Sequence, residues 1–232
     1  GVPPKLVLEK NSYSVLVGLS TLEQNIVKTD IPNLDLVGAD QDLAGAEIEL
    51  ASADRREFRL KDKLTEQVKS QYDYIMVDCP PSLGLLTLNS LTASDSFLIP
   101  MQCEYFALQG MTQILKTSKL VKTYLNPKLQ EEGIVVTMFD AKSNLSKQVF
   151  NEIRTYAQNR LFHTVIPRRV RLAESTSHGK PGIMYDPTCL GSRAYVELAK
   201  ELINREQGNF VAAAQNPLVP PDPVDRLTGG TV

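Results

Sequence analysis

The 232-residue chain contains no tryptophan, and its 8 tyrosines and 7 phenylalanines make aromatic side chains scarce. Aliphatic residues must therefore build most of the hydrophobic core. No apolar run approaches the roughly 18 residues that a membrane-spanning helix needs, so we expect no integral membrane protein and no membrane partner. The first five residues include neither an initiator methionine nor the apolar stretch of a signal peptide, which indicates processing or a start partway through a longer protein.

Cysteine is also rare, because the chain has only Cys79, Cys103 and Cys189, far apart in the sequence. No pair has the spacing of a zinc site, and an odd number of distant cysteines argues against a disulfide framework. We predict that all three are small, buried side chains in a reducing cytoplasm.

The net charge of −2 is small but unevenly distributed. Residues 1–140 carry 13 Lys/Arg and 19 Asp/Glu, whereas residues 141–205 carry 11 Lys/Arg and 5 Asp/Glu. A basic C-terminal third on an acidic body is compatible with an anionic partner on one face. An ordinary solvated surface gives the same pattern, so charge alone leaves both interpretations open.

Proline is concentrated near the C-terminus. Four prolines fall between residues 217 and 223, a density at which neither a helix nor a central strand persists. We therefore expect residues 206–232 to form a disordered, proline-rich tail after a single domain of residues 1–205.

The body of the chain alternates short β-branched runs with longer helical patterns. Such alternation is typical of βαβ units, in which helices cover both faces of a parallel sheet. It predicts an α/β fold with a doubly wound, mostly parallel sheet. The expected strands are residues 34–37, 74–77, 97–99, 134–138 and 164–166, and the expected helices are residues 43–50, 56–70, 83–92, 109–124, 143–160 and 195–205.

The residues that follow each strand are the candidates for a ligand site, because ligands of open parallel sheets bind beyond the carboxyl ends of the strands. Asp78 directly follows the apolar run of residues 74–77. This is the layout of a Walker B aspartate, which helps to hold the hydrated Mg²⁺ of a nucleotide. Turns and helix caps produce the same local pattern, so the run by itself does not decide between these roles.

The sequence around Asp78 is more specific. Residues 72–84, YDYIMVDCPPSLG, resemble the Walker B segment of the ParA/Soj family of deviant-Walker ATPases. The order and spacing of further segments match the family from about residue 12 to residue 205. These segments are LAGAEIEL at 43–50, LTASD at 91–95, IPMQCEYFALQG at 99–110, VIPRRVRLAE at 165–174, SHGKP at 177–181 and YDP at 185–187.

One part of the family pattern is missing. Family members begin with a strand and a deviant P-loop, KGGxxxKT, whose backbone amides and lysines bind the phosphates, followed by a second strand with an Asp-rich motif. Here Gly179-Lys180 is followed by Pro181, and no such loop exists. The resemblance therefore implies an N-terminally truncated portion of a ParA-type protein, with two central strands absent and a hydrophobic sheet edge exposed.

The resemblance also implies a nucleotide site for ATP and Mg²⁺. Asp78 is the expected Walker B acid and holds Mg²⁺ through a bound water, while Gln102 and Glu104 are expected to face the nucleotide or a dimer partner. The residues expected near the γ-phosphate or the adenine are Pro80, Pro81, Met138, Phe139, Asp140, Pro167 and Arg168.

A DNA-binding face is implied by the same family. Nonspecific binding needs only positive charge against phosphates, with no recognition helix in a groove. The residues expected there are Arg169, Arg171, Lys180 and Arg193, beside Arg168.

The function implied is that of an ATPase of chromosome or plasmid partitioning, in the bacterial cytoplasm and associated with the nucleoid. ATP would drive formation of a homodimer that binds DNA nonspecifically, and a ParB/Spo0J-type centromere-binding protein would stimulate hydrolysis. Two alternatives stay open. A MinD-like regulator of cell division would need a membrane-targeting helix, but residues 195–205 continue into the proline-rich tail. A non-catalytic interaction module would explain the missing P-loop.

Overall fold

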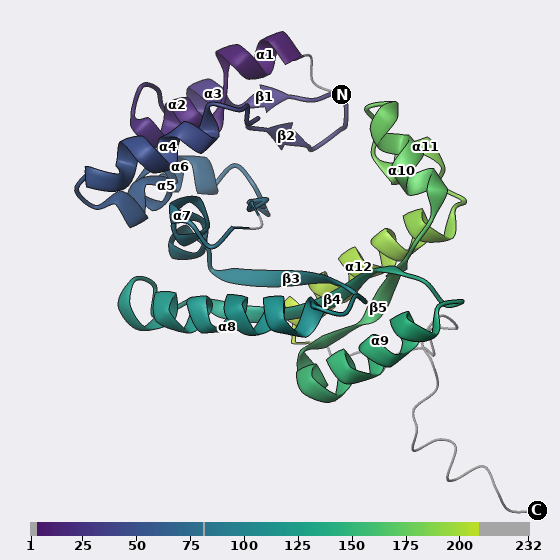
Figure 1. The fold of residues 1–232 in the computed structure, drawn as a ribbon. Coiled ribbons are helices and arrows are strands. Elements are labelled where there is room, and N and C mark those ends of the chain that lie inside the picture. The colour runs from purple at the N-terminus through teal and green to yellow at the C-terminus, as the bar shows by residue number, and fades with distance from the viewer. Residues whose placement is uncertain (1–3, 81, 209–232) are drawn as a thin grey trace, which may run out of the picture. The chain divides into compact units, whose positions relative to one another are not determined.

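The computed structural model describes residues 4–80 and 82–208, whose helices and strands are drawn in Figure 1. The chain divides into two compact units: one comprises residues 1–97 and 112–131, and the other comprises residues 98–111 and 132–232. The final helix ends at Glu206, one residue beyond the expected domain limit. Of residues 206–232, predicted to form a disordered tail, Glu206 belongs to the final helix, whereas residues 209–232 lie outside the described residues, so disorder there stays a prediction.

The first unit is mostly helical. Its short helices start and stop at local signals: Asn11 accepts a hydrogen bond from the Ser14 amide, and Gly18 closes the same helix in the left-handed conformation at φ 90°. The elements are α1 (Pro4–Glu9), α2 (Ser12–Val17), α3 (Leu22–Asn25), β1 (Val27–Lys28), β2 (Asp35–Leu36), α4 (Leu43–Glu49), η1 (Leu50–Ser52), η2 (Arg56–Phe58), α5 (Arg59–Lys63), α6 (Glu66–Lys69) and α7 (Leu85–Ala93).

Small hydrophobic clusters hold this unit together. Leu16, Ala46 and Leu50 are buried and join α2, α4 and η1. Val15, Leu22 and Val68 form a second cluster, and Leu91, Val121 and Leu129 form a third. The expected strand at 34–37 is realised only as β2, which pairs antiparallel with β1. The expected helix at 56–70 is divided into η2, α5 and α6, because Thr65 leaves the helical conformation and caps α6 with its hydroxyl.

The strand predicted for residues 74–77 is wrong. All four residues lie in irregular structure and are exposed, from 38% for Val77 to 80% for Met76. A parallel strand needs a neighbour for its backbone amides and carbonyls, and no strand of the described residues pairs with this run. Because residues 74–77 belong to no sheet, the predicted exposed hydrophobic sheet edge stays a prediction.

The second unit contains a three-stranded sheet in the order β3-β4-β5. The strands are β3 (Ser96–Gln102), β4 (Gln130–Phe139) and β5 (Leu161–Pro167), of which β3 and β4 each begin two residues inside the first unit. The helices are α8 (Ala107–Tyr124), which continues into the first unit, α9 (Asn144–Ala157), η3 (Gln158–Arg160), α10 (Val170–Ser177), α11 (Gly182–Tyr185) and α12 (Leu190–Glu206).

The sheet is parallel and has helices on both sides, which confirms the predicted α/β class. β4 pairs parallel with β5. Contacts from Gln130 to Asp95 and from Thr137 to Met101 advance in the same direction along β3 and β4. Figure 1 shows α9 and α12 on opposite sides of β4 and β5. Val135, Phe162 and Ile166 form the buried cluster beneath α10 and α12.

The register of β4 against β5 contains two irregularities. Ile134 pairs with Leu161 and Val136 with Val165, so β5 has two extra residues between these pairs. Phe139 then pairs with Pro167, which leaves one extra residue in β4, next to Met138 at φ 52°. Such bulges bend a strand and redirect its side chains, and they are common beside functional sites.

The last helix holds the bulged part of β5. The Glu201 carboxylate accepts hydrogen bonds from the amides of His163 and Thr164, both at 2.8 Å. Arg205 donates to the Leu161 carbonyl at 2.8 Å and lies 3.8 Å from the centre of the Phe162 ring. α12 therefore satisfies backbone groups that the bulge removes from the β4–β5 ladder.

The cysteines do not share one environment. Cys103 is buried and Cys189 is half-buried, but Cys79 is exposed, so its predicted burial is wrong. Cys79 follows the run at 74–77, and the absence of a paired strand there leaves it at the surface. Within residues 4–80 and 82–208, no helix is long and apolar enough to span a bilayer.

Candidate functional site

The carboxyl ends of three neighbouring strands form the candidate nucleotide site. Gln102 ends β3, Phe139 ends β4 and Pro167 ends β5. Because the strands are adjacent and parallel, these ends meet at one edge of the sheet. The structure therefore brings residues from three separate predicted motifs to the same edge.

The ends of β4 and β5 are joined directly. The Arg168 amide donates a hydrogen bond to the Phe139 carbonyl at 2.9 Å. Met138, in the left-handed conformation of the bulge, is 46% exposed and presents apolar surface at this junction. Such a surface suits the face of a nucleotide base. The structure thus places Met138, Phe139, Pro167 and Arg168 together, although their predicted role in nucleotide binding stays a prediction.

Two of the predicted adenine-site residues, Phe139 and Asp140, make contacts that stabilise the fold. The Phe139 side chain is buried, with its ring 5.4 Å from that of Phe150 on α9. The Asp140 carboxylate accepts a hydrogen bond from the Lys142 amide at 2.9 Å, and the Asp140 carbonyl accepts one from the Ser143 amide. Ser143 in turn caps α9, so Asp140 organises the turn that leads from β4 into that helix.

The loop after β3 is more exposed than its neighbours. Gln102 and Glu104 are both exposed, as a role against a nucleotide or a second chain would require. Beside them, Tyr105 and Phe106 are 77% and 71% exposed, and their rings form an edge-to-face pair at 5.0 Å. The sequence analysis assigned no role to this aromatic pair. In a chain with few aromatic residues, two adjacent aromatic residues in a loop already indicate an interaction surface.

Asp78 belongs to the first unit and is exposed in irregular structure. Pro80 is half-buried. Pro81 is not among the described residues, so its predicted place in the nucleotide site stays a prediction. An exposed carboxylate is suited to Mg²⁺, which keeps several waters and is bound by one or two protein carboxylates together with phosphates. In the described part of the chain, no three His, Cys, Asp or Glu side chains form a group that would hold a metal without a nucleotide.

The predicted DNA-binding residues are exposed on the second unit, around α10, α11 and α12. Arg171 forms ion pairs with Glu174 at 2.9 Å and with Asp186 at 3.7 Å. The hydrogen bond to Glu174 and the carboxylate charge raise the pKa of Arg171, so its positive charge is retained but partly compensated. Arg169 and Lys180 lie at exposed positions before and after α10.

Arg193 lies in a different setting. It lines a cavity of about 200 Å³ together with Ile183, Pro187, Ser192, Val196 and Glu197. The apolar side chains of this cavity are unlike a phosphate-binding surface, which consists of amides and cations. The structure therefore divides the predicted DNA-binding set into residues near α10 and one residue on α12.

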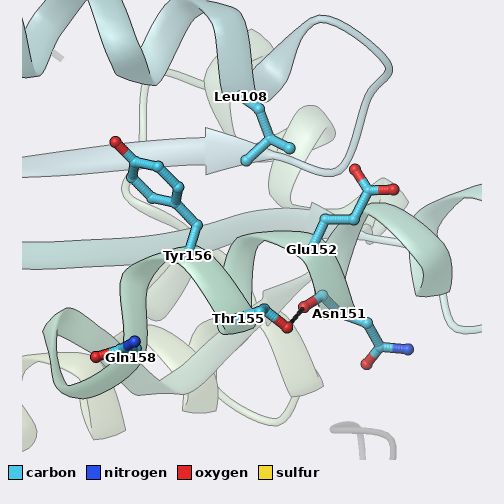
Figure 2. Close-up of a pocket in the computed structure, with 6 residues that line it drawn as sticks. All are labelled: Leu108, Asn151, Glu152, Thr155, Tyr156 and Gln158. Carbon is cyan, nitrogen blue, oxygen red and sulfur yellow. Dashed lines mark hydrogen bonds between the residues drawn. The ribbon is translucent and has the colours of Figure 1, made fainter.

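A larger cavity of about 700 Å³ is separate from these residues. Figure 2 shows its lining, which comes from the start of α8 and from α9 and η3: Leu108, Asn151, Glu152, Thr155, Tyr156 and Gln158. The Thr155 hydroxyl donates to the Asn151 carbonyl at 2.9 Å, and the charged lining residue is the acidic Glu152. None of the predicted site residues lines this cavity, and its charge does not suit a phosphate.

Each unit carries residues that suit one part of ATP–Mg²⁺. In the first unit Asp78 suits a hydrated Mg²⁺, and in the second unit the junction of β4 and β5 suits a base. The sequence contains no KGGxxxKT loop, so the backbone cradle and lysines for the phosphates are not supplied by these residues.

Comparison with known proteins gives a consistent result. The AAA domain family matches residues 4–131. The sporulation initiation inhibitor protein Soj of Bacillus subtilis is 52% identical over 198 residues, which cover 85% of this chain and 78% of that protein. The chromosome partitioning protein ParA of Caulobacter vibrioides is 45% identical over 203 residues, which cover 87% of this chain and 76% of that protein.

A solved structure shares the fold. Cobyrinic acid a,c-diamide synthase from Mycobacterium smegmatis, with a bound ATP analogue and magnesium, has a TM-score of 0.74 and 31% sequence identity. The similarity covers 89% of this chain and 76% of that chain.

Proposed function

Because the chain belongs to the Soj/ParA family of chromosome-partitioning proteins, we propose that it functions in DNA partitioning as an ATPase that uses Mg²⁺. The observation that carries this proposal is the hydrogen bond between the Arg168 amide and the Phe139 carbonyl. It joins the end of β4 to the family motif at residues 165–174, at the carboxyl edge of the parallel sheet, where ligands bind in this fold class.

The residues have distinct tasks in this proposal. Met138, which is 46% exposed in the bulge at the end of β4, offers apolar surface to the base. Asp78 holds a water of the hydrated Mg²⁺, which neutralises charge on the phosphates when it is bound. Phosphoryl transfer to water depends mainly on positioning and electrostatics, so the contribution of Asp78 is to fix the metal and not to form a covalent bond.

We further propose that the complete site includes a strand-bearing segment with a KGGxxxKT loop, so that this chain is a portion of the functional protein. The exposed run at residues 74–77, which forms no strand, supports this proposal, because its apolar side chains suit a sheet interior. A neighbouring strand would bury them and would place phosphate-binding amides beside Asp78.

The finer steps of the cycle are also proposals. ATP-dependent dimerisation is supported by the exposed loop that contains Glu104 and the Tyr105–Phe106 pair. Nonspecific DNA binding is supported by the exposed Arg168, Arg169 and Lys180. A ParB/Spo0J-type protein is the partner that would stimulate hydrolysis, and association with the nucleoid would follow from DNA binding.

Calorimetry of Mg-ATP binding tests the proposal. We expect no micromolar binding by the 232-residue chain alone and its restoration when a polypeptide with the KGGxxxKT loop and its strand is added. Micromolar binding by the chain alone would contradict the missing phosphate cradle. Failure in both cases would favour the alternative of a non-catalytic module, which the lack of a P-loop specifically supports.

A further inference from the structure

We propose that Glu47 is a positioning residue for the segment that carries Asp78, because its carboxylate caps the helix into which that segment leads. The inference rests on the proposed function for the importance of Asp78. The physical contact itself is independent of that function and can be tested without nucleotide.

The contact lies at the first turn of α7. The Leu86 amide donates a hydrogen bond to Oε1 of Glu47 at 3.1 Å. The first amides of a helix have no partner within the helix, and a side chain at the N-cap position usually accepts from one of them. The N-cap of α7 is Gly84, which has no side chain, and the first turn contains no acidic residue. Glu47, 37 positions before Gly84 in the sequence, supplies the missing acceptor and a negative charge that suits the helix dipole.

Gly84 and Glu47 fit each other sterically. A Cβ atom on Gly84 would lie 2.9 Å from Cδ of Glu47 and would overlap its Oε1. The backbone of Gly84 is extended, at φ −84°, a conformation open to any residue. A side chain at residue 84 would therefore displace the flexible end of the Glu47 side chain, while the backbone conformation itself would accept it.

The rest of α7 is fixed by other contacts. Oδ1 of Asn89 accepts from the Leu60 amide at 3.1 Å, and its Nδ2 donates to the Arg56 carbonyl at 2.8 Å. Asn89 is 1% exposed, and Leu85 and Leu86 pack against the cluster around Ala46. The middle of α7 is thus held by a buried amide. Its start is held by the apolar packing of Leu85 and Leu86, by the Thr87 hydroxyl, which donates to the Ser82 carbonyl at 2.5 Å, and by Glu47, which accepts from a backbone amide of the first turn.

This arrangement bears on Asp78 because Asp78 lies six positions before Gly84 in the sequence. Residues 74–80 form no strand, so the fixed start of α7 limits where the Asp78 segment can lie. Loss of the Glu47 contact would release the first turn of α7 and widen the range of positions open to Asp78. A catalytic group displaced by about 1 Å can lose roughly a hundredfold in rate.

Two substitutions remove the contact by different routes. Glu47→Ala deletes the carboxylate, and Gly84→Ala displaces it. In a double-mutant cycle we expect each single change to have nearly the full effect and the double variant to add little. Glu47→Gln keeps an acceptor oxygen, so this variant should retain most of the hydrogen bond and behave much like the unmodified chain. Glu49→Ala is the matched control, because Glu49 lies on the same helix but accepts from the Tyr13 hydroxyl at 2.7 Å.

The first measurement uses the full chain without nucleotide. Hydrogen exchange of the Leu86 amide should accelerate at least tenfold in Glu47→Ala and Gly84→Ala and stay unchanged in Glu49→Ala. The reaction rate of the exposed Cys79 thiol, next to Asp78, should change at least threefold in the same two variants and return toward the original rate in Glu47→Gln. Unchanged exchange at Leu86, or an unchanged rate at Cys79, would overturn the proposal.

The second measurement is Mg-ATP hydrolysis by the chain together with the KGGxxxKT polypeptide. We expect Glu47→Ala to lower kcat about tenfold or more while the KM for ATP changes less than threefold, because the base is bound at the other strands. Equal loss in kcat and in ATP affinity would instead indicate a merely structural role. Absence of hydrolysis in every variant would count against the proposed function, while the exchange and thiol results would still decide the role of Glu47.

Discussion

At the scale of single residues, burial separates the chemistry of two cysteines. Cys103 is 5% exposed at the end of β3, and burial raises its pKa to about 11. Cys79 is exposed beside Asp78. Because the thiolate is the reactive form, burial both blocks access to Cys103 and lowers its thiolate fraction.

We therefore expect a thiol reagent at pH 8 to modify Cys79 much faster than Cys103, since burial both keeps the reagent from Cys103 and raises the pKa of its thiol. Peptide mass spectrometry over a time course distinguishes the two sites. Heating through the unfolding transition should remove the difference, and equal rates in the folded chain would contradict the burial of Cys103.

Met138 is a second residue whose environment makes a testable difference. Its φ of 52° lies in the left-handed region, which costs a residue other than glycine about 1–2 kcal/mol. Its side chain is 46% exposed, so replacement loses little burial. We expect Met138→Gly to raise the free energy of unfolding by about 0.5–1 kcal/mol.

Met138→Val is the opposing variant, because a β-branched side chain tolerates the left-handed region poorly, and we expect it to be destabilised. Urea unfolding of both variants measures the difference. If the apolar surface of Met138 contacts the base, Met138→Gly should also weaken nucleotide binding despite the greater stability. A destabilised glycine variant would contradict the strain at this position.

At the scale of secondary-structure elements, Glu201 connects α12 to the bulge of β5. Burial by itself raises the pKa of this carboxyl, but the hydrogen bonds from His163 and Thr164 and the charge of Arg205 outweigh burial and lower it. A lowered pKa in the folded state means that the contribution to stability is present above the unfolded pKa, near 4.3, and is lost as the pH falls through the folded value.

We expect Glu201→Gln to lower the free energy of unfolding by about 2 kcal/mol at pH 7, the size of a hydrogen bond to a charged group. The difference from the unmodified chain should begin to diminish near about pH 4.3, where the unfolded carboxyl takes up its proton, and should vanish only below the lowered pKa of the folded carboxyl. Urea titrations at pH 7, 5 and 3.5 measure it. Glu197→Gln, which changes an exposed carboxylate of the same helix, is the control and should be nearly neutral.

At the scale of the whole molecule, the run at residues 74–77 is the most consequential feature. Met76 is 80% exposed, and contiguous exposed apolar residues usually mark an interaction surface. If this run pairs with a strand of a further segment, its side chains are exposed in this chain and buried in the assembled protein.

This difference predicts a variant with two distinct effects. Met76→Asp should change the stability of the 232-residue chain by less than about 0.5 kcal/mol, because surface substitutions are usually neutral. The same change should prevent the KGGxxxKT polypeptide from restoring Mg-ATP binding, because it would bury an unpaired charge. Calorimetry and urea unfolding test the two effects separately, and restored binding in the variant would show that residues 74–77 do not receive that segment.

The amino-acid sequence determined the α/β class and the family, because both depend on local information. Periodic apolar runs at 97–99, 134–138 and 164–166 became the strands of the sheet, and motifs such as residues 72–84 can be recognised without knowing their partners. The sequence also indicated which residues follow each strand, and the parallel sheet then brought Gln102, Phe139 and Pro167 to one edge.

Only the tertiary structure decided which apolar run formed a strand and which distant side chains met. Residues 74–77 have strand propensity but pair with no strand of the described residues, so Cys79 is exposed against expectation. The contacts of Glu47 with Leu86 and of Glu201 with β5 join residues far apart in the chain, and no local pattern encodes them. Strand pairing requires a neighbouring strand, and capping by a distant residue requires that the fold bring that residue to the helix end. The propensities of single segments contain no information about either partner.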